Sequence, residues 1–148
     1  MKLYNSLILI AFAIFSISIT AEVNHSKVIS QDAALKLSDY GFFTNLSKQI
    51  PTNGVLPYDL NSALFSDYAD KLRFVYVPAG GFAEYHPDEV FDFPTGSVLI
   101  KTFAYLNDFP ESELDAQLLE TRLLIRNDDG WKNVSYIWNK EQTDAYKS

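Results

Sequence analysis

Residues 120–138 read ETRLLIRNDDGWKNVSYIW, and this stretch decides the fold. It holds two segments in which apolar and polar residues alternate, and a period of two is typical of a half-buried β-strand. Between them lies Asn127-Asp128-Asp129-Gly130, a loop of the kind that closes a hairpin. The stretch therefore predicts an antiparallel hairpin. On the first strand the predicted apolar face holds Thr121, Leu123 and Ile125, and on the second strand Val134, Tyr136 and Trp138 lie on one face.

Two further strands are predicted before the hairpin. In residues 72–77, Leu72, Phe74 and Tyr76 fall on one face, and residues 98–106 alternate over a longer run. Four or more strands joined by short connections favour a sheet folded on itself or on a second layer. The predicted fold class is mainly β, an antiparallel β-sandwich or open barrel with short N-terminal helical segments.

The helical prediction rests on residues 30–37, SQDAALKL, where Ser30 suits an N-cap. Gly41 permits the left-handed residue that ends such a helix. Proline and glycine interrupt residues 42–69, so we expect an irregular loop whose apolar side chains pack on the core. Those side chains are Tyr58, Leu60, Leu64 and Phe65.

Charge and cysteine content exclude several kinds of partner and cofactor. The net charge is -7 at pH 7, which argues against nucleic acid, because phosphate binding needs a basic surface. The chain has no cysteine, so it cannot itself hold a disulfide, a thiolate-bound metal or a covalently attached c-type haem. Its 148 residues, 47% of them hydrophobic, suit one globular domain.

The first 21 residues predict export. Lys2 precedes an apolar run with the length of a secretory signal, which is short for a membrane-spanning helix. We place cleavage after Ala21, which leaves residues 22–148 as a single β-rich domain that is periplasmic or secreted. No stable membrane span is then expected after cleavage. An uncleaved N-terminal anchor is the alternative.

No residue pattern typical of catalysis stands out. The two histidines are His86, which precedes a proline in a turn, and His25, which lies where a chain is usually loose. Asp92 and Glu120 are a pair of carboxylates that a sheet could bring together, as a glycosidase requires. Glu111, Glu113 and Asp115 are better explained by a solvated loop or a first helical turn. We therefore expect that the chain is not an enzyme and has no catalytic or metal-binding residue.

Aromatic and charged residues on the predicted strands have two interpretations each. Three aromatic residues are candidates for ligand or partner contact, as a stacking platform for a sugar or a flat cofactor, with packing in the core as the alternative. They are Trp131, Tyr136 and Trp138. Lys101, Glu120 and Arg122 lie on strand faces otherwise rich in apolar groups, which predicts a cross-strand ladder of ion pairs, with a binding site as the alternative.

An ordered set of motifs resembles one bacterial family of exported domains. The motifs are LSDYGFF (37–43), LPYDLNS (56–62), LFSDYA (64–69), FPTGSVLIKTF (93–103), ETRLLIR (120–126), GW (130–131) and YIWNKEQTDA (136–145). The resemblance is to the domain that precedes, or occurs together with, c-type cytochrome modules, and it covers nearly the whole chain after the leader.

The resemblance implies a non-catalytic scaffold or docking domain of a cytochrome c-associated redox protein that takes part in electron transfer. Members of this kind continue into a Cys-x-x-Cys-His segment, whereas this chain ends at Ser148. Haem c is therefore implied only for a C-terminal or separate partner module, and no cofactor is expected in this chain. A truncated reading frame and a domain with a separate haem partner both remain open. The alternative function is a small-molecule or glycan-binding β-sandwich module that uses Trp131, Tyr136 and Trp138.

Overall fold

The computed structural model describes residues 21–62, 69–106 and 116–148. Ten elements lie in these ranges. They are α1 (His25–Val28), the 3-10 helix η1 (Leu37–Tyr40), β1 (Phe43–Asn45), β2 (Ile50–Pro51), β3 (Val55–Pro57), β4 (Asp70–Tyr76), β5 (Val98–Leu106), β6 (Ala116–Asn127), β7 (Gly130–Trp138) and β8 (Ala145–Lys147). The leader predicted for residues 1–21 falls almost wholly outside the described residues, and so do Glu111, Glu113 and Asp115.

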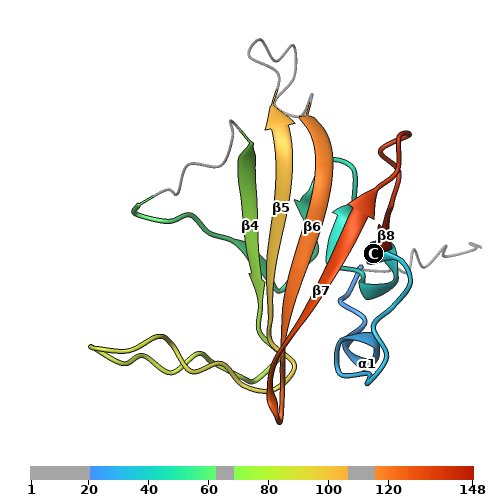
Figure 1. The fold of residues 1–148 in the computed structure, drawn as a ribbon. Coiled ribbons are helices and arrows are strands. Elements are labelled where there is room, and N and C mark those ends of the chain that lie inside the picture. Colours follow the sequence, from blue (N-terminus) through green and yellow to red (C-terminus); the bar gives the residue numbers. More distant parts are fainter. Residues whose placement is uncertain (1–20, 63–68, 107–115) are drawn as a thin grey trace, which may run out of the picture.

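Six of the strands form one antiparallel sheet in which neighbours in the chain are neighbours in space. The order is β3-β4-β5-β6-β7-β8, and the four long strands β4 to β7 stand side by side in Figure 1. β1 and β2 pair separately as a small two-stranded sheet. The prediction of a mainly β, antiparallel fold is confirmed.

The predicted hairpin of β6 and β7 is present, but its loop is shorter than the four residues expected. Asn127 and Gly130 already pair across the ladder, so Asp128 and Asp129 alone form its tip. β4 and β5 cover the predicted segments 72–77 and 98–106 to within two residues. Here the alternation of apolar residues was sufficient, because one face of each strand is buried and the other is not.

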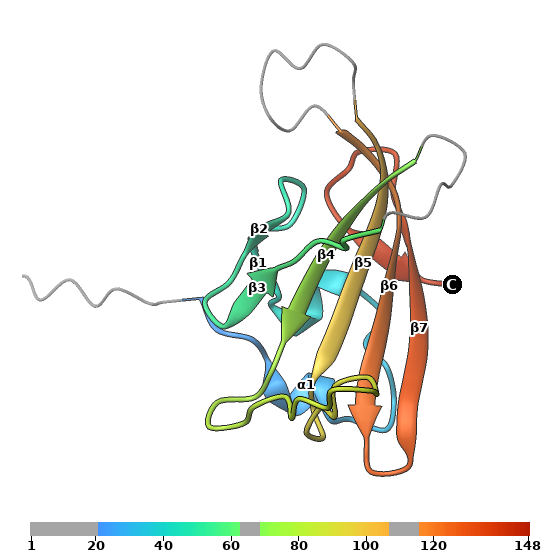
Figure 2. The ribbon, with the colours of Figure 1, turned by 90° about the vertical axis from the view of Figure 1, so that its left-hand side faces the viewer.

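The buried face, called the inner face below, is covered by the N-terminal segment of the chain. Figure 2 shows α1 and the small β1–β2 sheet on one side of the six-stranded sheet. Val28, Leu37, Tyr40 and Phe42 of this segment pack with the apolar side chains of the sheet in one hydrophobic core. The sheet residues of that core include Phe74, Tyr76, Val98, Ile100, Leu118, Leu123, Ile125, Val134, Tyr136 and Trp138.

A chain of polar groups crosses the inner face without exposing any of them. The Trp138 indole N–H donates to the Thr121 hydroxyl at 3.0 Å, and the Thr121 and Thr102 hydroxyls are 2.8 Å apart. Thr102 in turn donates to Gln49 Oε1 at 2.7 Å, which leaves Thr121 as the donor to Thr102. The Thr102 and Thr121 hydroxyls are thus both satisfied, which offsets the cost of burying them.

The helix predicted for residues 30–37 is wrong, although two short helical elements occur nearby, α1 before it and η1 at its end. The backbone of Ala34 bonds to two phenols instead: its N–H donates to Tyr40 and its carbonyl accepts from Tyr136. The Leu35 carbonyl accepts from the Lys147 N–H, so this stretch lies along the β8 edge of the sheet. Tertiary bonds have replaced the intrahelical ones. Gly41, at φ 67°, ends η1 in the predicted left-handed conformation.

The irregular loop predicted for residues 42–69 is only partly correct. Its first part forms the three short strands β1, β2 and β3. Tyr58 and Leu60 are 38% and 46% exposed, so they do not anchor the loop in the core. Leu64 and Phe65 lie outside the described residues.

The loop between β7 and β8 explains the polar residues of the last motif. The Gln142 side chain bonds to both the N–H and the carbonyl of Leu118, where the β5–β6 register shifts. The Asp144 carboxylate accepts from the N–H and hydroxyl of Ser38 at 3.2 and 2.6 Å. These residues join β6 and η1 to the last strand, so their role is to hold the fold.

Candidate functional site

The opposite, outer face of the sheet leaves large apolar side chains exposed. Tyr105, Leu124, Trp131 and Ile137 are between 39% and 51% exposed, and all but Trp131 stand next to a buried residue of the same strand. Exposed apolar side chains gathered on one face mark binding surfaces more often than scattered ones do. The outer face is therefore the candidate functional site.

One end of the outer face forms an apolar groove. Two adjoining hollows of about 430 and 520 Å³ share Phe91, Phe93 and Leu99 in their linings. One extends towards Tyr58 and Val75, and the other towards Leu124 and Trp131. The apolar groove is thus lined by Tyr58, Val75, Val77, Ala83, Val90, Phe91, Phe93, Leu99, Leu124 and Trp131, and Glu89 is the one charged residue of its lining. Its floor is the row Val75, Leu99 and Leu124, which are register partners on β4, β5 and β6.

One wall of the apolar groove is the connection between β4 and β5, and Arg126 holds it in place. The Arg126 guanidinium donates to the Phe93 carbonyl at 3.4 Å, lies 3.9 Å from the Asp92 carboxylate and stacks 5.9 Å from the Trp131 ring. Phe93 meets Trp131 edge to face, with ring centroids 5.9 Å apart. Arg126 therefore positions both aromatic side chains.

A row of three cations lies directly beside the apolar groove. Arg73 is the register partner of Lys101, and Lys101 is the register partner of Arg122. We call Arg73, Lys101 and Arg122 the cation row. Like charges directly opposite each other on neighbouring strands are destabilising. Burial, followed by the charges of Arg73, Lys71 and Arg122, lowers the pKa of Lys101, although Glu120 opposes this.

The ladder of cross-strand ion pairs predicted for Lys101, Glu120 and Arg122 is wrong. Arg122 makes a bidentate ion pair with Glu120, two residues away on its own strand, with both N–O distances 2.9 Å. This bonding lowers the pKa of Glu120. Among the described residues no carboxylate lies within ion-pair distance of Lys101, whose ammonium lies 4.7 Å from the centre of the Phe103 ring. The cross-strand neighbours are cations because the register, which the sequence pattern does not reveal, places them opposite each other.

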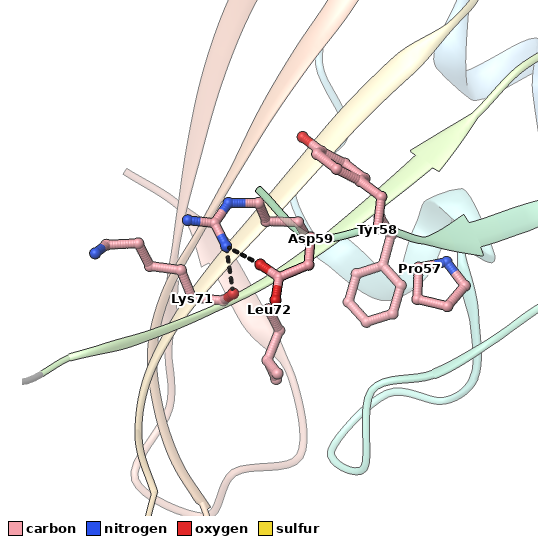
Figure 3. Close-up of a pocket in the computed structure, with 7 residues that line it drawn as sticks. Pro57, Tyr58, Asp59, Lys71 and Leu72 are labelled. Carbon is pink, nitrogen blue, oxygen red and sulfur yellow. Dashed lines mark hydrogen bonds and ion pairs between the residues drawn. The ribbon is translucent and has the colours of Figure 1, made fainter. Parts of the chain in front are cut away.

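Arg73 ends the cation row at the edge of the sheet. β3 pairs with β4 only as far as Phe74, with one further bond from the Tyr58 N–H to the Arg73 carbonyl. The Arg73 guanidinium donates to the Lys71 carbonyl at 3.0 Å and to Asp59 at 3.4 Å, and both partners are labelled in Figure 3. Its side chain is 8% exposed. Arg73 therefore covers part of the sheet edge.

The structure does not bring the three predicted contact residues together. Tyr136 and Trp138 are 0% and 7% exposed and lie in the inner-face core, whereas Trp131 is 43% exposed and lines the apolar groove. Alternation along β7 separates them, because residue 131 falls on the opposite face from residues 136 and 138. Of the three, Trp131 alone lies at the candidate site.

The other predicted pairs are also separated. Asp92 lies beside Arg126, and Glu120 is paired with Arg122. The two arginines are four residues, or about 13 Å, apart along β6, so the two carboxylates are held apart as well. His25 is held rather than loose, since its Nδ1 is 3.3 Å from the Tyr76 hydroxyl. Within the described residues no group of three or more His, Asp or Glu side chains is placed to hold a metal ion.

Comparisons of the chain with family models, with curated proteins and with solved structures found no match. None of the helices in the described part of the chain has the length and apolar character needed to cross a bilayer.

Proposed function

We propose that this chain is a non-catalytic docking domain, exported from the cell, which binds a c-type cytochrome partner through the outer face of its sheet. The single observation that supports this function is the apolar groove beside the cation row. A sheet normally buries one apolar face in its own core, and here a second apolar area is left exposed on the other face.

The groove is suited to a protein partner. Its two hollows are shallow and continuous, and Trp131 and Phe91, both about half exposed, stand beside them. Aromatic side chains in the centre of a patch, with charged groups around them, are typical of protein interfaces. The cytochrome as partner comes from the motif resemblance, and the groove is the place where it would dock.

The experiment compares two exposed leucines on different sides of the molecule. The purified chain is immobilised, an extract of exported proteins from the cell that encodes it is passed over, and retained haem is measured by Soret absorbance. Leu124→Asp changes the apolar groove, and Leu35→Asp changes a leucine beside β8 as the matched control. Both variants are checked for native circular dichroism.

The proposal expects haem retention by the wild type and by Leu35→Asp, and its loss in Leu124→Asp. Retention by all three proteins would place the cytochrome elsewhere on the chain. If none of the three retains haem, the partner is not a cytochrome. Either result contradicts the proposed function.

A further inference from the structure

We propose that the element docking on the outer face is an acidic amphipathic helix of the partner, with its apolar stripe in the groove and its carboxylates on the cation row. This inference rests on the proposed docking function and names the chemistry of the partner surface.

The first argument is the direction of the two rows. The groove floor, Val75-Leu99-Leu124, crosses the strands, and the cation row crosses the same strands two residues further along each. The two rows are therefore parallel and about 7 Å apart. A ligand with a single anionic head at one end could not use both rows along their length, whereas a rod with an apolar stripe beside an acidic stripe can.

The second argument is spacing. Neighbouring strands lie about 4.8 Å apart, so consecutive cations in the row are separated by about that distance. Residues three or four apart on a helix have Cβ atoms about 5 to 6 Å apart. Arg73 is buried against Asp59 and Arg122 is already paired with Glu120, so a helix laid across the strands would place its central carboxylate opposite Lys101, with the two guanidinium groups on either side. Its diameter of about 10 Å spans both rows at once.

The third argument is charge. Lys101 lies between two cations, and among the described residues its charge has no carboxylate within ion-pair distance. An acidic partner would supply the missing negative charge at the centre of the row. A flat anionic bilayer fits less well, because the wall of the groove exposes Glu84, Asp88 and Glu89 towards solvent, and a plane would meet them.

The probes are two synthetic stapled helices of about 14 residues, or four turns. Both carry leucines at positions i, i+4 and i+7. They differ in the flanking row, which is Glu in one peptide and Gln in the other. Binding to the full chain is followed by amide chemical shifts in NMR, at about 0.02 M and about 0.2 M salt. Lys101→Gln tests the cation row, and Lys27→Gln, on α1 at the inner side, is the matched control.

We expect the Glu peptide to shift amides of β4 to β6 around Lys101 and Leu99 and to bind about tenfold more tightly than the Gln peptide at low salt. Most of this difference should vanish at the higher salt concentration. Lys101→Gln should weaken the Glu peptide several-fold and leave the Gln peptide unchanged, while Lys27→Gln should change neither.

Equal affinity for the two peptides, with shifts confined to the groove, would overturn the acidic partner while leaving the outer face as the docking surface. Binding of neither peptide, or binding only to vesicles that contain phosphatidylglycerol, would overturn the helix as the occupant. In each case haem retention by the Leu124→Asp and Leu35→Asp pair decides the docking function separately, so failure of one proposal is distinguishable from failure of the other.

Discussion

The inner and outer faces of the sheet are made from alternate residues of the same strands, but they differ in how their polar groups are paired. On the inner face, Thr102 and Thr121 meet partners that match them donor to acceptor. On the outer face, Lys101 meets Arg73 and Arg122, which carry its own charge. The pairing on the inner face stabilises the fold. The like charges on the outer face lower the stability of the fold, which is common at surfaces selected for binding.

The largest expected difference compares two adjacent leucines of β6. Leu123 is fully buried on the inner face, whereas Leu124 is 39% exposed in the apolar groove. Leu123→Ala should lower the free energy of unfolding by about 2 to 5 kcal/mol, because it leaves a cavity. Leu124→Ala should cost less than about 1 kcal/mol. Urea unfolding of both variants measures the difference, and equal losses would mean that the outer face is as buried as the inner one.

A second, smaller effect tests whether the buried polar chain stabilises the inner face. Thr121→Val keeps the shape of the side chain but removes the acceptor for the Trp138 indole and the donor to Thr102. We expect a loss of about 1 to 3 kcal/mol in the free energy of unfolding, because two buried groups lose partners. Thr121→Ser, which keeps the hydroxyl, is the control in urea unfolding. A valine variant as stable as wild type would show that these bonds contribute nothing.

The inner face could be predicted from sequence because burial imposes a period that single residues reveal. Leu72, Phe74 and Tyr76, like the six residues of the β6–β7 face, were placed correctly from alternation alone. The helix predicted for residues 30–37 does not form, because the Ala34 backbone bonds to the phenols of Tyr40 and Tyr136, and no local sequence pattern shows these bonds. β8 was missed for a similar reason, since three residues are too few to show a period.

The candidate site was less predictable, because it depends on which strand neighbours which. The sequence marks Lys101 and Arg122 as charges on apolar faces, but the pattern predicts opposite charges across the ladder and gives no sign of Arg73. The sequence signal that could have found the cation row is a basic residue in each of three strands, combined with a meander order. The groove depends in addition on the connection between β4 and β5, whose path follows from Arg126.

The third prediction uses pH to detect the burial of the Tyr136 phenol in the inner-face core. Burial, with help from the bond to Tyr40, raises the pKa of Tyr136 well above its usual value. The native state then holds a proton that the unfolded state releases above about pH 10, so stability is full below that pH and falls as the pH rises further. The slope contributed by Tyr136 should reach at most about 1.4 kcal/mol per pH unit.

Tyr136→Phe is the variant that isolates this effect. At neutral pH it should cost about 1 to 2 kcal/mol, because the Ala34 carbonyl loses its donor. Its deficit relative to wild type should shrink between about pH 9 and about pH 11 in urea unfolding. Burial also raises the pKa of Tyr76, but that residue is present in both proteins and cancels in the difference. A deficit that stays constant with pH would show that Tyr136 does not hold its proton more tightly in the fold.

The smallest effect has the opposite sign and bears most directly on the outer face. Lys101→Met keeps most of the side-chain length and removes the central charge of the cation row. The pKa of Lys101 is lowered in the fold, which means that its ionised form is disfavoured there. Removing the charge should therefore raise the free energy of unfolding at pH 7 by a few tenths of a kcal/mol, and by about 1 kcal/mol at most. The contact of the ammonium with Phe103 is lost too, but Arg122 lies 4.9 Å from the same ring and remains. Salt at about 1 M should reduce the gain but not abolish it, because salt screens the repulsion from the neighbouring cations and leaves the larger effect, burial of the ammonium, in place. Lys140→Met, in an exposed loop, should show no gain at any salt concentration. A Lys101→Met variant that is more stable yet binds the acidic helix less well would show that Lys101 is retained for recognition. A loss of stability in that variant would show instead that Lys101 stabilises the fold and that the cation row needs no binding role to explain it.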